Sequence, residues 1–414
     1  MKYRFFVRNG SNLSSIGIKW TILVLAFPWV ADFLLLFVNN NSKTLASFVI
    51  PTLDEVVLSG FLLSIFCLLV FLTATFCSRI YMRHGSETPL VSNKPFSSAC
   101  TSLLPIFLIL DSIFILSSLK YGLTNAILAF RFNTQPIGVL GYIILLFFPI
   151  VLSVTWTRNK TIVNYFLLVL ITFTNLLTGF RVLLINAFFL IAIYNYNYFL
   201  SFKTKNKVIA LLVLLVSLIL FANFRGALES GNSETLFGVE SILQAAGRSL
   251  PIRYIAVALR ENIIFDWTFS LKVFTEPFFL IFSTIFSLDE PESVSIIVAD
   301  RVVRDFLIWR GTSDAISSGF SINILANAFI LDGFLGLIGF SIFLGIFLGI
   351  GLRLLQAQSM INRLFGTCFI TFVIGSTESF GEAWKLLFYW TFFLFGMVIY
   401  SRMIQNLAFA KTLK

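Results

Sequence analysis

Charged side chains are scarce in this chain. Only 12% of its 414 residues are Asp, Glu, Lys or Arg, whereas an ordinary soluble domain has about 25%. Histidine occurs once, proline ten times and cysteine four times. The apolar composition excludes a disordered chain, and the few cysteines exclude a disulfide scaffold. A soluble enzyme is also disfavoured, because the apolar surface is too large for one water-facing core.

The same scarcity removes most catalytic and metal-binding motifs. His84 is the single histidine and no cysteines form a CxxC pair, so no Cys/His zinc set can be built. We interpret the four cysteines as small apolar side chains within helices. The chain also lacks a phosphate-binding P-loop, a nucleophile elbow, an HExxH motif and a dinucleotide fingerprint. We therefore expect no metal and no cofactor.

Apolar residues are what the chain has in abundance. They make up 58% of the sequence, with 50 Phe, and the mean hydropathy is +0.92. Runs of roughly 20 apolar residues, which can cross a bilayer, occur ten times, at 20–38, 56–78, 101–119, 137–156, 162–180, 182–202, 208–224, 334–352, 364–381 and 385–402. Two further stretches, 263–287 and 316–331, either span the membrane or lie on it. The composition predicts an all-α polytopic integral membrane protein with about 10 transmembrane helices (10–12).

The distribution of basic residues predicts the orientation. With the N-terminus in the cytoplasm, the inner segments hold 17 Lys and Arg and one acid, and the short outer loops hold five bases. Because cytoplasmic segments of membrane proteins are enriched in Lys and Arg, both termini are predicted to be cytoplasmic. The net charge of +10 follows from this topology and does not indicate a nucleic-acid partner.

These predictions divide the chain into three parts. Residues 1–224 form a bundle of seven transmembrane helices, 225–320 an outer loop, and 321–414 a bundle of about three. The loop carries 12 of the 20 acids and is too long for a passive link. Apolar residues at helical spacing over 236–259 and 294–307 predict amphipathic helices against the outer face of the membrane. Long outer loops are where membrane enzymes often place a site.

Arginines of the outer face are the candidate phosphate ligands. The planar guanidinium keeps its charge and offers several donors to phosphate oxygens. Arg181 and Arg225 lie at predicted span ends, and Arg248 and Arg253 lie in the loop. Arg253 and Arg260 are seven residues apart, so they share one face of a helix that continues through them. The alternative is contact with phospholipid headgroups or with acids of the loop. The four residues that we expect to bind a diphosphate are Arg181, Arg225, Arg248 and Arg253.

Carboxylates are the candidate bases, since the predicted outer face has no histidine. We select Asp314, which lies in a polar stretch just before an apolar run, as the catalytic base. The alternative for each carboxylate is a solvated or arginine-paired group. The other candidates are Glu240, Glu261, Asp300, Asp305 and Glu378, and Glu382 lies at the same predicted outer turn as Glu378.

Two acids and a glycine-rich run lie inside predicted spans. A carboxylate within the bilayer is costly and is a functional candidate by default. For Asp32 and Asp111 we expect hydrogen-bonded packing roles, because two scattered acids do not form a proton relay. Glycines at spacings of three and four residues over 333–351 predict close helix packing.

Taken together, the chain resembles the bacterial O-antigen polymerases of the Wzy type and, more distantly, the O-antigen ligases. The plan is similar over the whole length: inner termini, many spans and one large periplasmic loop late in the chain. The sequence TGFR at 178–181 looks like the small-residue–arginine turn of these polymerases. The sequences FSINIL at 320–325 and DGFLG at 332–336 look like the loop exit and the Gly-x-x-Gly span start of both families.

The resemblance implies a glycosyltransferase of the bacterial inner membrane that works at its periplasmic face. Such an enzyme moves the growing glycan from undecaprenyl pyrophosphate to the non-reducing end of a new lipid-linked repeat unit. Its partners are this lipid-linked oligosaccharide and membrane lipid, and a chain-length regulator protein is left open. In the ligases a histidine commonly precedes the asparagine of the exit segment, whereas Ile322 precedes Asn323 here. This favours a polymerase over the alternatives, a ligase or other lipid-linked glycosyltransferase. A flippase or transporter would have balanced halves and short loops.

Overall fold

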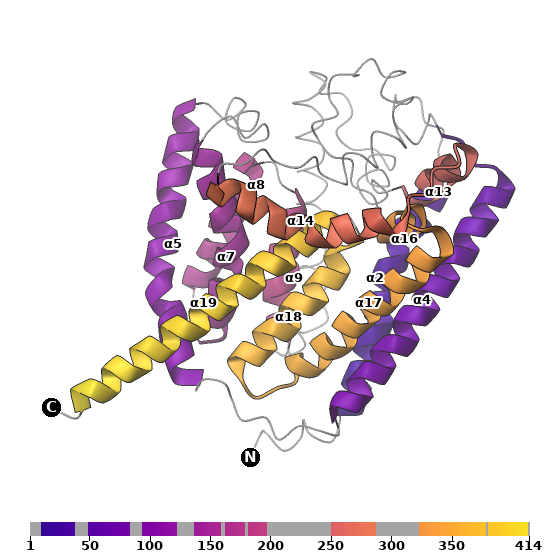
Figure 1. Ribbon diagram of the computed structural model, residues 1–414. Coiled ribbons are helices and arrows are strands. Elements are labelled where there is room, and N and C mark those ends of the chain that lie inside the picture. Colours follow the sequence, from indigo (N-terminus) through magenta and orange to yellow (C-terminus); the bar gives the residue numbers. More distant parts are fainter. Residues whose placement is uncertain are drawn as a thin grey trace. The chain divides into compact units, whose positions relative to one another are not determined.

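The computed structural model describes residues 10–37, 49–82, 93–121, 136–158, 162–178, 181–196, 250–286, 323–377 and 380–412. These residues are helical and contain no strand; one isolated β-bridge pairs Phe265 with Leu331. The helices (Figure 1) are α2 (Gly10–Leu34), α4 (Leu53–Met82), α5 (Asn93–Tyr121), α7 (Pro136–Arg158), α8 (Ile162–Thr178), α9 (Arg181–Tyr194), α13 (Pro251–Arg260), α14 (Trp267–Phe286), α16 (Ile324–Ile330), α17 (Gly333–Leu355), α18 (Met360–Gly375) and α19 (Phe380–Thr412).

Several of these helices are long and apolar enough to cross a membrane, which confirms a helical membrane protein. Of the ten predicted apolar runs, nine overlap a described helix, and 208–224 lies outside the described residues. The number of spans and the outer loop stay predictions. Within the described residues, five stretches meet the length and hydropathy of a span: Gly17–Leu34, Leu53–Ile80, Asn93–Lys120, Gly333–Leu355 and Phe380–Asn406.

Each of the two uncertain stretches contains one described helix. In 316–331 the described helix is α16, whose 7 residues extend only about 10 Å and cannot cross a bilayer. In 263–287, α14 has 20 residues and includes Lys272 and Glu276. Figure 1 shows the axis of α14 running across those of α4 and α17. Of the predicted amphipathic helices, 294–307 lies outside the described residues, and the described end of 236–259 belongs to α13.

The described helices form two compact units, each made of separate chain segments. Unit 1 comprises Met1–Arg83, Phe237–Ile350 and Phe372–Lys385. Unit 2 comprises His84–Leu236, Gly351–Thr371 and Leu386–Lys414. The predicted domain limits at 224 and 320 lie outside the described residues and stay predictions.

Glycines of α17 allow close packing on α4 within unit 1. A Cβ added to Gly345 would lie 2.6 Å from the Cβ of Thr73, and one added to Gly349 would lie 2.6 Å from the carbonyl oxygen of Ala74. Both distances are too short for a side chain. The predicted packing role of the glycine-rich run is therefore confirmed for these two residues.

In unit 2, α7 contacts α5, α8 and α9. Its residues from Ile150 to Leu152 are fully buried. Asp111 of α5 is buried and accepts a hydrogen bond of 2.5 Å from the hydroxyl of Thr174 in α8. The hydrogen-bonded packing role predicted for Asp111 is thus what the structure shows. The four cysteines lie in α4, α5 and α18 as free side chains, as predicted.

Candidate functional site

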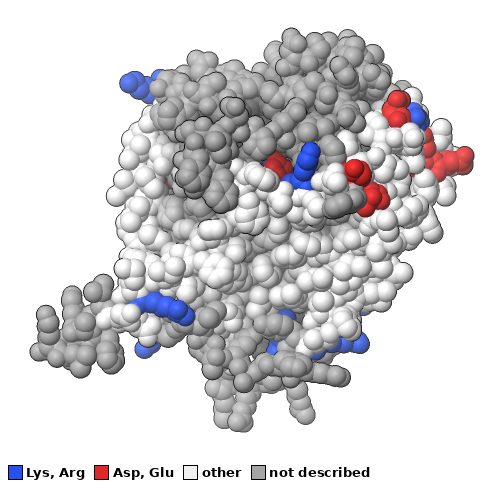
Figure 2. Space-filling model, in the orientation of Figure 1, with Lys and Arg blue, Asp and Glu red and all other residues white. Residues whose placement is uncertain are grey.

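Charged side chains gather where α13 packs on one end of unit 1. This short helix contacts α2, α4 and α16 and lies over the ends of α2 and α4 (Figure 1). Asp32 near the end of α2 and Glu55 near the start of α4 both reach it. Figure 2 shows charged residues at the ends of α4 and an uncharged surface between them. This end of unit 1 is the one that the orientation analysis predicts to face outward.

The start of α13 is capped by a carboxylate from another helix. Leu250, the preceding residue, has a left-handed backbone with φ of 30° and provides no side-chain cap. Asp32 provides one instead: its Oδ2 accepts hydrogen bonds from the backbone N–H groups of Ile252, at 2.8 Å, and Arg253, at 3.3 Å. A carboxylate at a helix N-terminus accepts hydrogen bonds from the free N–H groups and interacts favourably with the positive end of the helix dipole. Asp32 therefore fixes where α13 begins.

The same carboxylate forms a buried ion pair with the Arg253 guanidinium. Asp32 is 0% and Arg253 2% exposed, and Arg253 Nη1 contacts Asp32 Oδ1. Arg253 Nε also donates to the carbonyl oxygen of Val49 at 3.1 Å. Burial lowers the pKa of Arg253 to about 10, so the guanidinium stays charged at neutral pH. We name Asp32 and Arg253 the cap pair.

A second ion pair ties the other end of α13 to α4. Arg260 Nε and Nη2 donate to the two carboxylate oxygens of Glu55, each at 2.7 Å, and Nη2 also donates to the carbonyl oxygen of Ile50 at 2.8 Å. The hydrogen bond to Glu55 raises the pKa of Arg260. Arg253 and Arg260, seven residues apart, both reach toward α2 and α4, as expected for one helical face. The two pairs hold α13 at both of its ends.

A further charged group, which we name the lysine cluster, joins α14 to the start of α19. Lys385 Nζ contacts Glu276 Oε1 at 2.9 Å and Glu382 Oε1 at 3.3 Å. The neighbouring Trp384 donates its indole N–H to the carbonyl oxygen of Phe274 at 3.0 Å. One lysine thus serves two carboxylates, which leaves the cluster with a net negative charge.

Asn323 caps the start of α16. Its Oδ1 accepts a hydrogen bond from the backbone N–H of Leu325 at 2.8 Å. Its Nδ2 donates to the carbonyl oxygen of Thr377, just beyond α18, at 2.6 Å. The asparagine therefore joins the start of α16 to the end of α18.

The junction between α16 and α17 is a tight turn with two residues of positive φ, Asp332 at 78° and Gly333 at 60°. The backbone N–H of Asp332 donates to the carbonyl oxygen of Phe265 at 2.8 Å, so the turn also binds the start of α14. A Cβ on Gly336 would lie 1.7 Å from the carbonyl oxygen of Leu331. The two glycines of the Gly-x-x-Gly motif are thus required by backbone conformation and by close approach.

Of the residues predicted to bind the diphosphate or act as base, the structure places two. Arg253 belongs to the buried cap pair, and Arg181 is the first residue of α9 in unit 2. Arg225, Arg248 and Asp314 lie outside the described residues and stay predictions, as do four alternative bases. Those four are Glu240, Asp300, Asp305 and Glu378. Glu261 is exposed in the turn that follows α13.

Sequence reasoning missed the three described long-range charge pairings at this end of unit 1. Asp32 and Arg253 are 221 residues apart, and Glu55–Arg260 and Glu276–Lys385 also join segments that are far apart in the sequence. The available signal was the presence of opposite charges at the predicted outer end of spans and in the outer loop. That signal predicts a shared side of the membrane, but it does not predict which charges meet.

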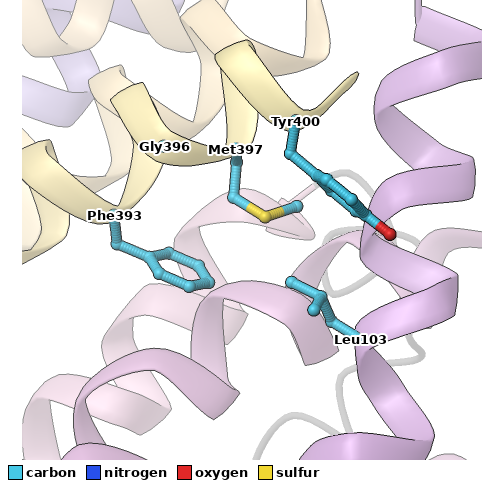
Figure 3. Close-up of a pocket in the computed structure, with 5 residues that line it drawn as sticks. All are labelled: Leu103, Phe393, Gly396, Met397 and Tyr400. Carbon is cyan, nitrogen blue, oxygen red and sulfur yellow. The ribbon is translucent and has the colours of Figure 1, made fainter. Parts of the chain in front are cut away.

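An apolar groove on unit 2 offers no polar chemistry. It has a volume of about 260 Å³ and is lined by five residues of α5 and α19 (Figure 3). The groove is open above Gly396, where a Cβ would meet nothing within 4 Å. Its lining residues are Leu103, Phe393, Gly396, Met397 and Tyr400. Because both helices are candidate spans, this groove is suited to a hydrocarbon chain.

The described residues contain no group of three His, Cys, Asp or Glu side chains that could hold a metal ion. Comparison of the chain with protein-family models, with curated proteins and with solved structures gives no match.

Proposed function

We propose that the protein polymerises lipid-linked O-antigen repeat units at the periplasmic face of the bacterial inner membrane. In this proposal it is a metal-independent glycosyltransferase with both termini in the cytoplasm. It transfers the growing glycan from undecaprenyl pyrophosphate to the non-reducing end of a new lipid-linked repeat unit. The lipid-linked oligosaccharide is its substrate, and membrane lipid surrounds it.

The docking of α13 is the observation that carries the proposal. An arginine-bearing helix of the predicted periplasmic segment is held on the ends of two membrane helices by ion pairs at Asp32 and Glu55. Burying the cap pair is costly, because both charges lose their hydration. Its presence supports a role in holding the polar segment in one position at the membrane surface. In the proposal, the diphosphate of the lipid-linked donor binds at this level of the membrane.

The reaction requires cations at the leaving group and a proton acceptor at the attacking hydroxyl. Guanidinium groups stabilise the charge that develops on a departing diphosphate. Arg181, Arg225 and Arg248 are the proposed ligands of the diphosphate. Arg253 lies in the same outer segment, buried in its ion pair with Asp32. A carboxylate accepts the proton from the acceptor sugar, and Asp314 is the residue that sequence reasoning proposes.

Deletion of the gene in its host, with lipopolysaccharide separated on a gel, tests the function. The expected product is lipid A core bearing a single repeat unit, because flipping and ligation continue without polymerisation. Bare core without a repeat unit would indicate a flippase or a ligase. An unchanged ladder would place the protein outside this pathway.

Complementation of the deletion strain tests the arginine site. Arg181→Ala and Arg225→Ala are each expected to lower ladder formation about 100-fold, the usual effect of losing one charge-stabilising donor. Arg79→Ala is the matched control, because Arg79 is exposed and lies at the predicted cytoplasmic end of α4. Equal protein in the membrane, measured by immunoblot, is required of all three variants. A full ladder with both outer variants would contradict the proposed site.

A further inference from the structure

We infer that Glu382, held by the lysine cluster, is the carboxylate that accepts the proton of the acceptor hydroxyl. This inference rests on the proposed function and names a residue that the described structure favours over the other acids of the same end of unit 1. It makes Glu382 a catalytic residue, and Lys385 and Glu276 positioning residues.

The other described acids at this end either bind another group of the protein or have no group that orients their side chains. Asp32 is buried in the cap pair, and Glu55 is bound through both oxygens to Arg260. Asp266 accepts from the backbone N–H and hydroxyl of Thr268 at the start of α14. Glu276 is almost fully buried, with a side chain 7% exposed. Each of these carboxylates is committed to the fold or shielded from a substrate.

Three further described acids are accessible to solvent, but no described group orients their side chains. Within the described residues, no hydrogen bond or ion pair orients the side chains of Asp54, Glu261 and Asp332. An unoriented carboxylate samples many positions and is a poor proton acceptor for a fixed hydroxyl. These three acids therefore rank below an acid that is both accessible and held.

Glu382 combines the two properties. Its side chain is 47% exposed, and its Oε1 contacts Lys385 Nζ at 3.3 Å. Lys385 is itself 13% exposed and fixed by Glu276 at 2.9 Å. Within the described part of the chain, the remaining oxygen, Oε2, has no hydrogen-bond partner, and it is the atom that would accept from a hydroxyl group. Because Lys385 is shared with Glu276, its charge does not fully neutralise Glu382.

The backbone that carries Glu382 is also fixed. Glu382 lies in the first turn of α19, two residues before Trp384, whose indole N–H binds the carbonyl oxygen of Phe274. The Trp384 ring contacts Phe343 and Phe372, with ring centroids 5.6 and 5.8 Å apart. Packed aromatic rings on several helices restrict the first turn of α19 and hence the position of Glu382.

The step balances with groups that the proposal names. The acceptor hydroxyl oxygen forms a bond to the anomeric carbon of the donor glycan with its own electron pair. The bond from this carbon to the diphosphate oxygen breaks, and the electron pair leaves with undecaprenyl pyrophosphate. The hydroxyl proton passes to Glu382 Oε2 and then to water. A diphosphate is a good leaving group, so the attacking hydroxyl needs no stronger proton acceptor than a carboxylate.

Membranes of the deletion strain, which hold its own lipid-linked repeat units, provide the assay when the variant proteins are added back. Glu382→Gln and Glu382→Ala are expected to lower the initial rate of ladder formation at least about 100-fold, as for loss of a general base. Glu382→Asp retains part of the rate. Asp54→Asn is the matched control, because it removes an exposed, unheld carboxylate of the same end.

Rescue by formate separates catalysis from structure. Added formate is expected to restore part of the rate of Glu382→Ala, because it fits the space of the missing carboxylate. It should not restore Glu382→Gln, where the amide occupies that space. Lys385→Arg is expected to keep more activity than Lys385→Ala, because it keeps the positive charge that orients Glu382.

Two results would overturn the inference without touching the proposed function. One is a wild-type rate for Glu382→Gln together with loss of activity in Asp314→Asn, which would assign the base to Asp314. The other is a loss in Glu382→Ala that formate does not restore, which would assign Glu382 a structural role. If wild-type protein forms no ladder in these membranes, the proposed function itself fails.

Discussion

At the scale of single residues, Asp32 serves two purposes at once. It caps the N-terminus of α13 and neutralises Arg253, although the two residues lie on different helices. A helix that begins at Pro251 after a residue with positive φ has no local cap. The distant carboxylate therefore takes the place of the serine, threonine or aspartate that usually precedes a helix.

We predict that Arg253→Ala and Asp32→Ala each lower the free energy of unfolding by about 3–5 kcal/mol, since each leaves an uncompensated buried charge. The double variant Asp32→Ala/Arg253→Ala is expected to lose less than the sum of the two single losses. Thermal unfolding in detergent provides the measurement. Additive losses would show that the two side chains are not coupled.

At the scale of elements, the tight turn between α16 and α17 requires glycine at two positions. Gly333 supplies a positive φ, and Gly336 brings the first turn of α17 against the carbonyl oxygens of Leu331 and Ala328. No side chain fits at Gly336, because its Cβ would overlap the backbone, which cannot move away as a flexible side chain would. The Gly-x-x-Gly pattern therefore has a local structural cause that is independent of any catalytic role.

We predict opposite effects for two glycine substitutions in α17. Gly336→Ala is expected to destabilise the protein strongly, because the added methyl group meets backbone oxygens. Gly339→Ala is the matched control and should stabilise by up to about 1 kcal/mol, since nothing lies within 4 Å of its Cβ and alanine favours helix. Melting temperatures in the same detergent compare the two. Equal melting temperatures would contradict the close approach at Gly336.

At the scale of the whole molecule, the helix ends that meet in unit 1 agree with the predicted alternation of spans. The end of α2 and the start of α4 both bind α13, and the start of α16 binds the end of α18 through Asn323 and Thr377. Alternating spans place these same ends on one side of the membrane. The side that they face stays a prediction from the positive charges.

Cysteine labelling tests that orientation in intact cells. In a variant with Cys67, Cys77, Cys100 and Cys368 replaced, Glu261→Cys is expected to react with a membrane-impermeant maleimide from outside. Gln358→Cys, between α17 and α18, is expected to react only after the membrane is opened. Both positions are exposed, so access depends on the side of the membrane. The reverse pattern would contradict the orientation, and with it the periplasmic location of the proposed site.

Several features of the fold could be predicted from composition and pattern. The long apolar runs predict helices at nearly the observed places, because a bilayer allows few alternatives to a helix for a chain that must satisfy its own backbone hydrogen bonds. The glycine spacing in 333–351 predicts close packing, since small residues leave room for a neighbour. The candidate arginines were selected by their chemistry and predicted side of the membrane, and Arg253 is the one for which the structure describes the surroundings.

Which charges meet was decided by tertiary structure alone. The sequence by itself determined a helical membrane protein, the places of its apolar helices and the acids and bases expected at their outer ends. It could not determine that Asp32 would cap α13, or that Lys385 would reach Glu276 of α14 as well as Glu382 of its own helix. The pairings between helices depend on the rotation and depth of segments that are far apart in the sequence, and local patterns do not encode either quantity.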